Sequence, residues 1–187
     1  MCGRYTLFNE QDNEEIRNII QKVNEKYPEY KIKTGEIYPT NSVPVILQQG
    51  GKITPDLSVW GFPNYMKKGN IINARSETAL DKKTFRASLL ERRCAVPSTG
   101  FYEWSPSKEK VLFTLPESVL YMAGIYRRTG AESCFVILTT NANASVADIH
   151  DRMPVILTKE KIQGWITDTD MALSYLNEPM PLLNRSS

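Results

Sequence analysis

Short apolar segments separated by turn residues fill the second half of this chain and constrain its fold more than any other feature. They have the composition of strands and cover residues 95–96, 100–104, 111–115, 120–126, 133–138 and 155–157. Short strands joined by turns favour antiparallel pairing, because a parallel pair requires a long crossover connection. Upstream, an alternating segment from Ser42 reaches a Gln-Gln-Gly-Gly turn, and residues 53–62 are predicted to return as the second strand of a hairpin.

Three segments have the pattern of helices. Residues 12–26 place three isoleucines and a valine on one helical face, with acidic residues early and a lysine late, as the helix dipole favours. Residues 82–92 and a segment beginning at Lys159 are the other two predicted helices, whereas residues 177–187 are poorly specified. We therefore predict a single α+β domain over residues 1–187, with a largely antiparallel, barrel-like sheet as its core and helices on its flanks.

The composition fits one globular unit and excludes several classes of protein. A chain of 187 residues with 41% hydrophobic content can bury a substantial core. No apolar run approaches the length of a membrane span and the start lacks a secretory signal, so we expect a cytoplasmic protein without membrane contact. The net charge of +2 supplies no strong global field for a polyanion, so any nucleic-acid site has to be local.

The cysteines argue against a metal or disulfide scaffold. Cys2, Cys94 and Cys134 are an odd number without CxxC spacing, which fits neither a disulfide framework nor a zinc ribbon. We expect Cys94 and Cys134 to be buried thiols. We also expect a monomer that works without a metal or a cofactor.

Cys2 stands directly after Met1, and this position gives it a chemistry that an internal cysteine lacks. Removal of Met1 would leave an α-amine and a thiol on adjacent carbons. The amine can condense with an aldehyde to a Schiff base, and the thiol can then add to the same carbon and close a thiazolidine ring. Many chains begin Met-Cys by chance, so this reading depends on what else the chain contains.

Four further segments place polar residues where loops join apolar strands, which is where sites are commonly built. They are Ile72-Asn73-Ala74-Arg75-Ser76-Glu77-Thr78, Gly100-Phe101-Tyr102-Glu103-Trp104, Thr139-Thr140-Asn141-Ala142-Asn143 and His150-Asp151-Arg152-Met153-Pro154. Together with the opening Met-Cys-Gly-Arg, they resemble the SOS-response-associated peptidase (SRAP) family over nearly the whole chain. The resemblance implies a DNA-associated protein that covalently traps abasic sites in single-stranded DNA through Cys2. It also implies autopeptidase or lyase-type activity, association with the nucleoid and a possible contact with the replication machinery.

Three residues are candidates for proton transfer and substrate positioning beside Cys2. Glu103 lies among aromatic residues, where desolvation would raise its pKa and suit it to acid/base catalysis, unless it is an outward-facing charge on an alternating strand. His150, the single histidine, titrates near neutral pH, although a lone histidine is more often a surface or capping residue. Asn73 could hydrogen-bond the amine or the sugar, or it could satisfy its own turn. The resemblance favours the catalytic role for all three.

Six residues are candidates for holding the strand. Arg4 and Arg75 could bind phosphates through their guanidinium groups. Trp60 and Trp104 could stack on bases. Pro39 could be a rigid apolar wedge between bases, and Thr139 could donate its hydroxyl to a phosphate. All except Thr139 have a plainer alternative: solvated arginines, core aromatics or a turn proline.

Two rival functions remain open. Glutamine amidotransferases with an N-terminal nucleophile also begin Met-Cys-Gly, but they need an oxyanion hole and a carboxylate clamp, and no Asn-Gly-Asp type segment supplies them here. A module that binds single-stranded DNA without covalent chemistry is the other alternative, with Cys2 incidental.

Overall fold

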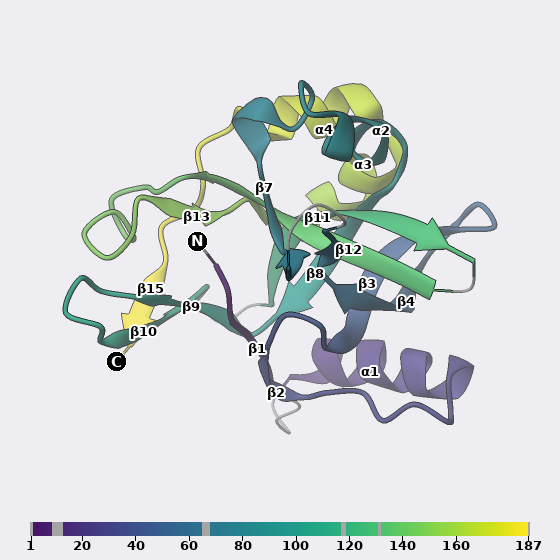
Figure 1. The fold of residues 1–187 in the computed structure, drawn as a ribbon. Coiled ribbons are helices and arrows are strands. Elements are labelled where there is room, and N and C mark those ends of the chain that lie inside the picture. Colours follow the sequence, from purple (N-terminus) through teal and green to yellow (C-terminus); the bar gives the residue numbers. More distant parts are fainter. Residues whose placement is uncertain (1, 9–12, 65–67, 117–118, 131, 187) are drawn as a thin grey trace.

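A closed barrel of five strands forms the centre of the fold (Figure 1). This computed structural model describes residues 2–8, 13–64, 68–116, 119–130 and 132–186. Going around the barrel, the strands are β12 (Glu132–Asn141), β4 (Lys52–Trp60), β3 (Ser42–Gln49), β8 (Arg93–Ser98) and β11 (Leu120–Thr129), which pairs again with β12. All these pairs are antiparallel except β12 with β4. The predicted α+β class and the barrel-like sheet are therefore confirmed.

Short strands extend the barrel at its rim. They are β7 (Asn73–Arg75) and β13 (Arg152–Pro154), which both pair with β12, and β14 (Ile156–Leu157), which pairs with β11. A separate two-stranded ribbon joins β5 (Phe62–Pro63) to β6 (Asn70–Ile71). β7 pairs with β12 in parallel and β13 pairs with it antiparallel. Two segments from distant parts of the chain therefore lie beside the same strand at the rim.

A second, five-stranded sheet lies beside the barrel, at the left of Figure 1, and carries both ends of the described chain. Its order is β15 (Asn184–Ser186), β10 (Lys110–Thr114), β9 (Gly100–Trp104), β1 (Tyr5–Leu7) and β2 (Gly35–Ile37), and every pair is antiparallel. Three of these strands have only three residues, too few to show an alternating pattern in the sequence. The tail expected to be poorly specified is held by this pairing and by Asn143, whose side chain donates to the carbonyls of Met180 and Pro181.

Four helices flank the sheets in the part of the chain that the structure describes: α1 (Glu14–Lys26), α2 (Lys83–Glu91), α3 (Lys161–Thr167) and α4 (Thr169–Tyr175). A 3-10 turn, η1 (Ser76–Thr78), follows β7. In Figure 1, α1 lies under the β3–β4 hairpin, and the other helices gather on the opposite side. The predicted start of the first helix at Asp12 falls outside the described residues, and Asn13 caps α1 by accepting from the Ile16 amide.

The helix expected from Lys159 is interrupted. Asp168 adopts an extended backbone, and its side chain accepts a 2.9 Å hydrogen bond from the amide of Met171, which starts α4 as a new helix. An N-cap aspartate inside a helical pattern was the signal for this break. No helix among the described segments is long and apolar enough to cross a membrane.

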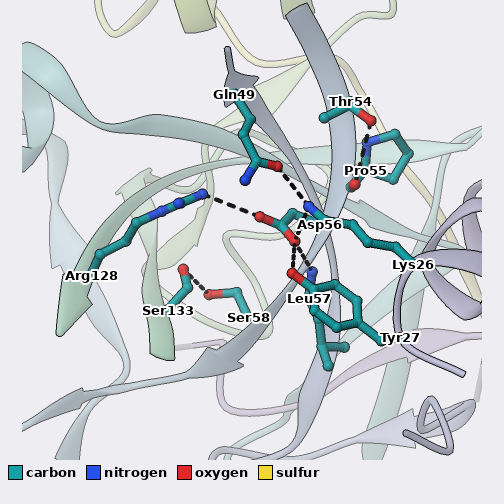
Figure 2. Close-up of polar contacts among 10 residues, drawn as sticks. All are labelled: Lys26, Tyr27, Gln49, Thr54, Pro55, Asp56, Leu57, Ser58, Arg128 and Ser133. Atoms are coloured by element: carbon teal, nitrogen blue, oxygen red, sulfur yellow. Dashed lines mark hydrogen bonds and ion pairs between the residues drawn. The ribbon is translucent and has the colours of Figure 1, made fainter. Parts of the chain in front are cut away.

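A buried carboxylate anchors α1 to the barrel (Figure 2). Asp56 on β4 accepts hydrogen bonds from the ammonium of Lys26 at 2.8 Å, the hydroxyl of Tyr27 at 2.6 Å and the backbone amide of Leu57 at 3.0 Å. Arg128 on β11 pairs with its second oxygen at 3.2 Å. These donors outweigh the effect of burial, so the pKa of Asp56 lies below its usual value.

Candidate functional site

Glu103 lies on the inner face of the five-stranded sheet. Side chains alternate between the two faces of β9, so Phe101 and Glu103 point inward while Tyr102 and Trp104 point outward. Glu103 is only 3% exposed, and this burial raises the pKa of its carboxyl to about 7. The alternative that Glu103 is an outward-facing surface charge is therefore wrong, and its carboxyl can exchange a proton near neutral pH.

Cys2 is fully buried next to this carboxylate. Its thiol donates a weak 3.8 Å hydrogen bond to the carbonyl of Arg4. Burial, and then the nearby charge of Glu103, raise the pKa of the Cys2 thiol far above its usual value. The thiol is therefore protonated at neutral pH in the resting protein. Met1 lies outside the described residues.

Asn73 fixes the backbone of Cys2. Its side-chain amide donates a 2.8 Å hydrogen bond to the Cys2 carbonyl, and β7 holds it through the parallel pairing with β12. The side-chain oxygen of Asn73 is buried and accepts no hydrogen bond from the residues that the structure describes. Leaving a buried acceptor unsatisfied costs about 1–3 kcal/mol, so this oxygen is ready to receive a donor from a substrate or from a new amino group.

His150 faces Glu103 from the turn before β13. Its Nε2 lies 4.0 Å from the Glu103 carboxylate, and burial lowers its pKa. Nδ1 accepts a 3.0 Å hydrogen bond from the backbone amide of Arg152, which places the proton of the neutral ring on Nε2, toward Glu103. Asp151 also lies 2.9 Å from Nδ1, so it can accept from this nitrogen when the ring is protonated.

Arg152 and Glu77 lock together the two loops that carry Asn73 and His150. The guanidinium of Arg152 forms a bidentate pair with Glu77, at 2.6 and 2.9 Å, and donates to the side chain of Asn141. Glu77 lies in η1, directly after β7, so the pair fixes β7 against β13. Neither residue was predicted to have a role, because they are 75 positions apart in the sequence and only the fold brings them together.

Two residues predicted to contact DNA are instead buried. Trp60 has no exposed surface, packs against Tyr5 and Phe135, and donates its indole N–H to the Ile72 carbonyl at 3.0 Å. Its ring therefore cannot stack on a base. The prediction of a base-stacking role for Trp60 is wrong, and the residue is a core aromatic. Thr139 is also fully buried, with its carbonyl and hydroxyl oxygens facing Arg152, which contradicts a phosphate contact.

The remaining candidates lie at the surface around the site. The guanidinium of Arg4 lies against two rings, the half-buried ring of Trp104, at 4.9 Å, and the ring of Tyr38, at 4.3 Å. Pro39 is half-buried in the turn closed by the hydrogen bond from Asn41 to Tyr38. Arg75 is exposed at the end of β7.

Arg75 also borders a pocket next to the candidate active site. The pocket has a volume of about 360 Å³ and lies between β7 and the start of α2. Its lining includes Asn73, Arg75, Lys82 and Phe85. The predicted site thus comprises an inner group, Cys2, Asn73, Glu103 and His150, and an outer rim that carries Arg4, Arg75, Trp104 and Pro39. Within the described ranges, no three His, Cys, Asp or Glu side chains come together as metal ligands.

Comparison with known proteins gives this arrangement a family. The model of the family described as SOS response associated peptidase (SRAP) matches residues 1–184. The chain is 34% identical over 200 residues to the abasic site processing protein YoqW of Bacillus subtilis, an alignment that covers 94% of this chain and 84% of YoqW. It is 26% identical over 178 residues to the abasic site processing protein YedK of Escherichia coli, covering 89% and 79% of the two chains.

Solved structures share the fold. A protein from Bacteroides thetaiotaomicron superposes with a TM-score of 0.77 at 24% identity, covering 98% of this chain and 90% of its own. A phage-related protein from Bordetella bronchiseptica has a TM-score of 0.77 at 22% identity, covering 99% and 93%. Because the family model spans nearly the whole sequence and the relatives align over most of their own length, the chain belongs to the SOS response associated peptidase family.

Proposed function

We propose that this protein processes abasic sites in single-stranded DNA by capturing them covalently through Cys2, after removal of Met1. The observation that carries the proposal is the convergence of Asn73, Glu103 and His150 on Cys2 from three separate elements. The names of the relatives, which are abasic site processing proteins, support the same substrate class. The open form of an abasic deoxyribose is an aldehyde, which is the partner that a terminal cysteine needs.

Ring opening of the sugar comes first. It moves one proton from the C1 hydroxyl to the ring oxygen. The Glu103 carboxylate accepts the hydroxyl proton while the protonated fraction of His150 gives one up, so the pair holds the same number of protons before and after. A carboxyl with a pKa of about 7 has both forms available for such a transfer near neutral pH.

Bond formation then follows in two steps. The unprotonated α-amine of Cys2 adds to the aldehyde carbon, and one of its protons passes to the carbonyl oxygen. The remaining nitrogen proton then leaves with this hydroxyl as water, which gives a neutral imine. A free α-amine has a pKa of roughly 8, so a neutral fraction is present at physiological pH. The thiol adds second: its sulfur bonds the imine carbon and its proton passes to the nitrogen, which closes the thiazolidine. The raised pKa of the Cys2 thiol fits this order, because the amine is then the first nucleophile.

The test is an incubation with a single-stranded oligonucleotide that contains one abasic site, followed by denaturation. We expect a stable adduct without borohydride, and intact mass should show that Met1 is absent. An oligonucleotide with a reduced abasic site, which has no aldehyde, should give none. Cys2→Ala keeps an amine and should form only an adduct that borohydride has to trap.

Cys134→Ala is the matched control, because this half-buried cysteine lies on β12 and should leave the adduct unchanged. A stable adduct with Cys2→Ala, or crosslinking through Cys2 in a chain that retains Met1, would exclude the thiazolidine. Equal binding of intact and abasic strands without any adduct would favour the non-covalent module. Release of glutamate from glutamine would favour an amidotransferase.

A further inference from the structure

Three hydrogen-bond donors converge on one carboxylate at the outer face of the five-stranded sheet. Glu36, on β2, accepts from the guanidinium of Arg4 at 3.3 Å, from the hydroxyl of Tyr38 at 3.0 Å and from the ammonium of Lys110. Two of the three donors are cations, and they come from β10 and from the residue that precedes β1. The three donors therefore form an anion-binding position, and the carboxylate of the protein's own Glu36 occupies it.

Both cations also lie against aromatic rings. Arg4 lies against Tyr38 and Trp104, and the ammonium of Lys110 lies 3.9 Å from the centre of the Tyr102 ring. The strand registers explain the grouping, because Lys110 lies opposite Trp104 across the β9–β10 pair and the Tyr102 amide bonds the Arg4 carbonyl. Proteins that bind single-stranded DNA commonly combine cationic and aromatic side chains on one surface. The cations bind the phosphates, and the bases stack on the rings.

The Glu36 carboxylate carries the same charge as a phosphate of a DNA strand. Hydrogen bonding from Lys110, followed by that from Tyr38, lowers the pKa of Glu36, so its carboxylate carries one negative charge at neutral pH. A phosphodiester also carries one negative charge and presents two acceptor oxygens. The side chains of Arg4, Glu36 and Lys110 are 26%, 30% and 34% exposed, so solvent reaches the group. The Nε of Arg4 is buried and donates no hydrogen bond to any residue that the structure describes.

We propose that Arg4, Tyr38 and Lys110 form a subsite for a backbone phosphate of the captured strand, and that Glu36 occupies this subsite in the free protein. The inference rests on the proposed function in that the strand has to reach Cys2. Arg4 is two residues from Cys2, at most about 7 Å along the backbone, so the subsite begins on the segment that carries the reacting residue. Binding displaces Glu36, which therefore competes with DNA and weakens the hold on any strand.

Equilibrium binding to a fluorescent oligothymidylate without an abasic site tests the subsite. Because no aldehyde is present, the outcome does not depend on the covalent chemistry, and failure of one proposal leaves the other standing. Glu36→Gln removes the competing charge but keeps acceptors for Tyr38 and Lys110. We expect it to bind several-fold more tightly at low salt, with the logarithmic salt dependence steeper by about 0.7.

Lys110→Met keeps an apolar side chain against Tyr102 and removes the charge, and it should flatten the salt dependence by about 0.7. Lys159→Met is the matched control, because Lys159 pairs with Glu15 on α1 and should leave the slope unchanged. Weaker binding by Glu36→Gln, or an unchanged slope, would overturn the proposal. The same holds if Lys110→Met behaves like Lys159→Met. If thermal melting shows that Glu36→Gln does not fold, the proposal is tested by comparing the salt dependence of Lys110→Met with that of Lys159→Met.

Discussion

The side-chain amide of Asn73 donates a 2.8 Å hydrogen bond to the backbone carbonyl of Cys2. This bond joins the rim of the barrel to the segment that precedes β1 and orients the residue whose amine and thiol react in the proposed capture. The oxygen of the Asn73 amide is also buried, and within the described part of the chain no group donates a hydrogen bond to it.

Asn73→Ala should slow adduct formation on the order of a hundredfold, because a small displacement of a nucleophile has that effect on a positioned reaction. The fold should remain, since a single hydrogen bond contributes about 0.5–1.5 kcal/mol. Single-turnover crosslinking at saturating DNA measures the rate. Asn177→Ala is the control, because Asn177 makes the same kind of bond to the Leu173 carbonyl on exposed α4. Equal rates for the two variants would remove Asn73 from the site.

Glu103→Gln should slow capture on the order of a hundredfold and yet stabilise the protein above pH 7. In the folded state burial raises the pKa of Glu103 to about 7, whereas the unfolded chain titrates near 4.5. The folded protein therefore binds the extra proton between these values, and the stability that this proton contributes is lost as pH rises through this window. Thermal melts of both proteins from pH 5 to pH 8 check the sign. A parental protein that gains stability relative to the variant at higher pH would contradict it.

Arg75→Ala should weaken binding to single strands regardless of their sequence. Phosphate contacts position the backbone without reading bases, so the salt dependence should flatten by about 0.7 for one lost contact. The melting temperature should stay the same, because Arg75 is exposed at the end of β7. A salt series beside a thermal melt separates the possibilities: an unchanged slope with a lower melting temperature would make Arg75 structural.

Asp56→Asn should destabilise the fold by about 1–3 kcal/mol at neutral pH and leave capture unchanged. The lower part of this range applies if solvent screens Lys26 and Arg128, which are 34% and 43% exposed. Because the pKa of Asp56 is lowered by folding, its contribution is present above the unfolded value of 3.8 and is lost as pH falls through the folded value. Urea unfolding at pH 7 and pH 3 should show the difference from the parental protein shrinking in acid.

The sequence predicted the parts of the fold that have a long pattern. Helix α1 and the strands β3, β4, β11 and β12 contain enough turns or alternations for their buried faces to be recognised. The strands β1, β2 and β15 have three residues each and depend on their neighbours, so no local pattern could show them. The parallel contact of β4 with β12 was also missed, because closure of a barrel is a property of the whole sheet.

The inner site was easier to predict than its rim. Cys2 has a chemistry that follows from its own position, whereas the resemblance to the family favoured Asn73, Glu103 and His150, and the fold brings the four residues together. Base-stacking residues were harder to predict from the sequence, because an aromatic side chain can lie equally well in a hydrophobic core or on a DNA-binding surface. Trp60 and Trp104 differ in which face of a strand they occupy, and only the register of the sheet decides this.

The pairing of β1 with β9 has a consequence for how the protein is made. Tyr5 pairs with Phe101, so the ribosome adds 96 further residues before the first strand can meet this partner. At about 5–20 residues per second, this interval lasts roughly 5–20 s. Cys2 is buried in the finished fold, so the removal of Met1 that the proposed capture requires would be easiest on the nascent chain within this interval. Under the proposed function, slower translation would therefore raise the fraction of molecules that carry a reactive terminus.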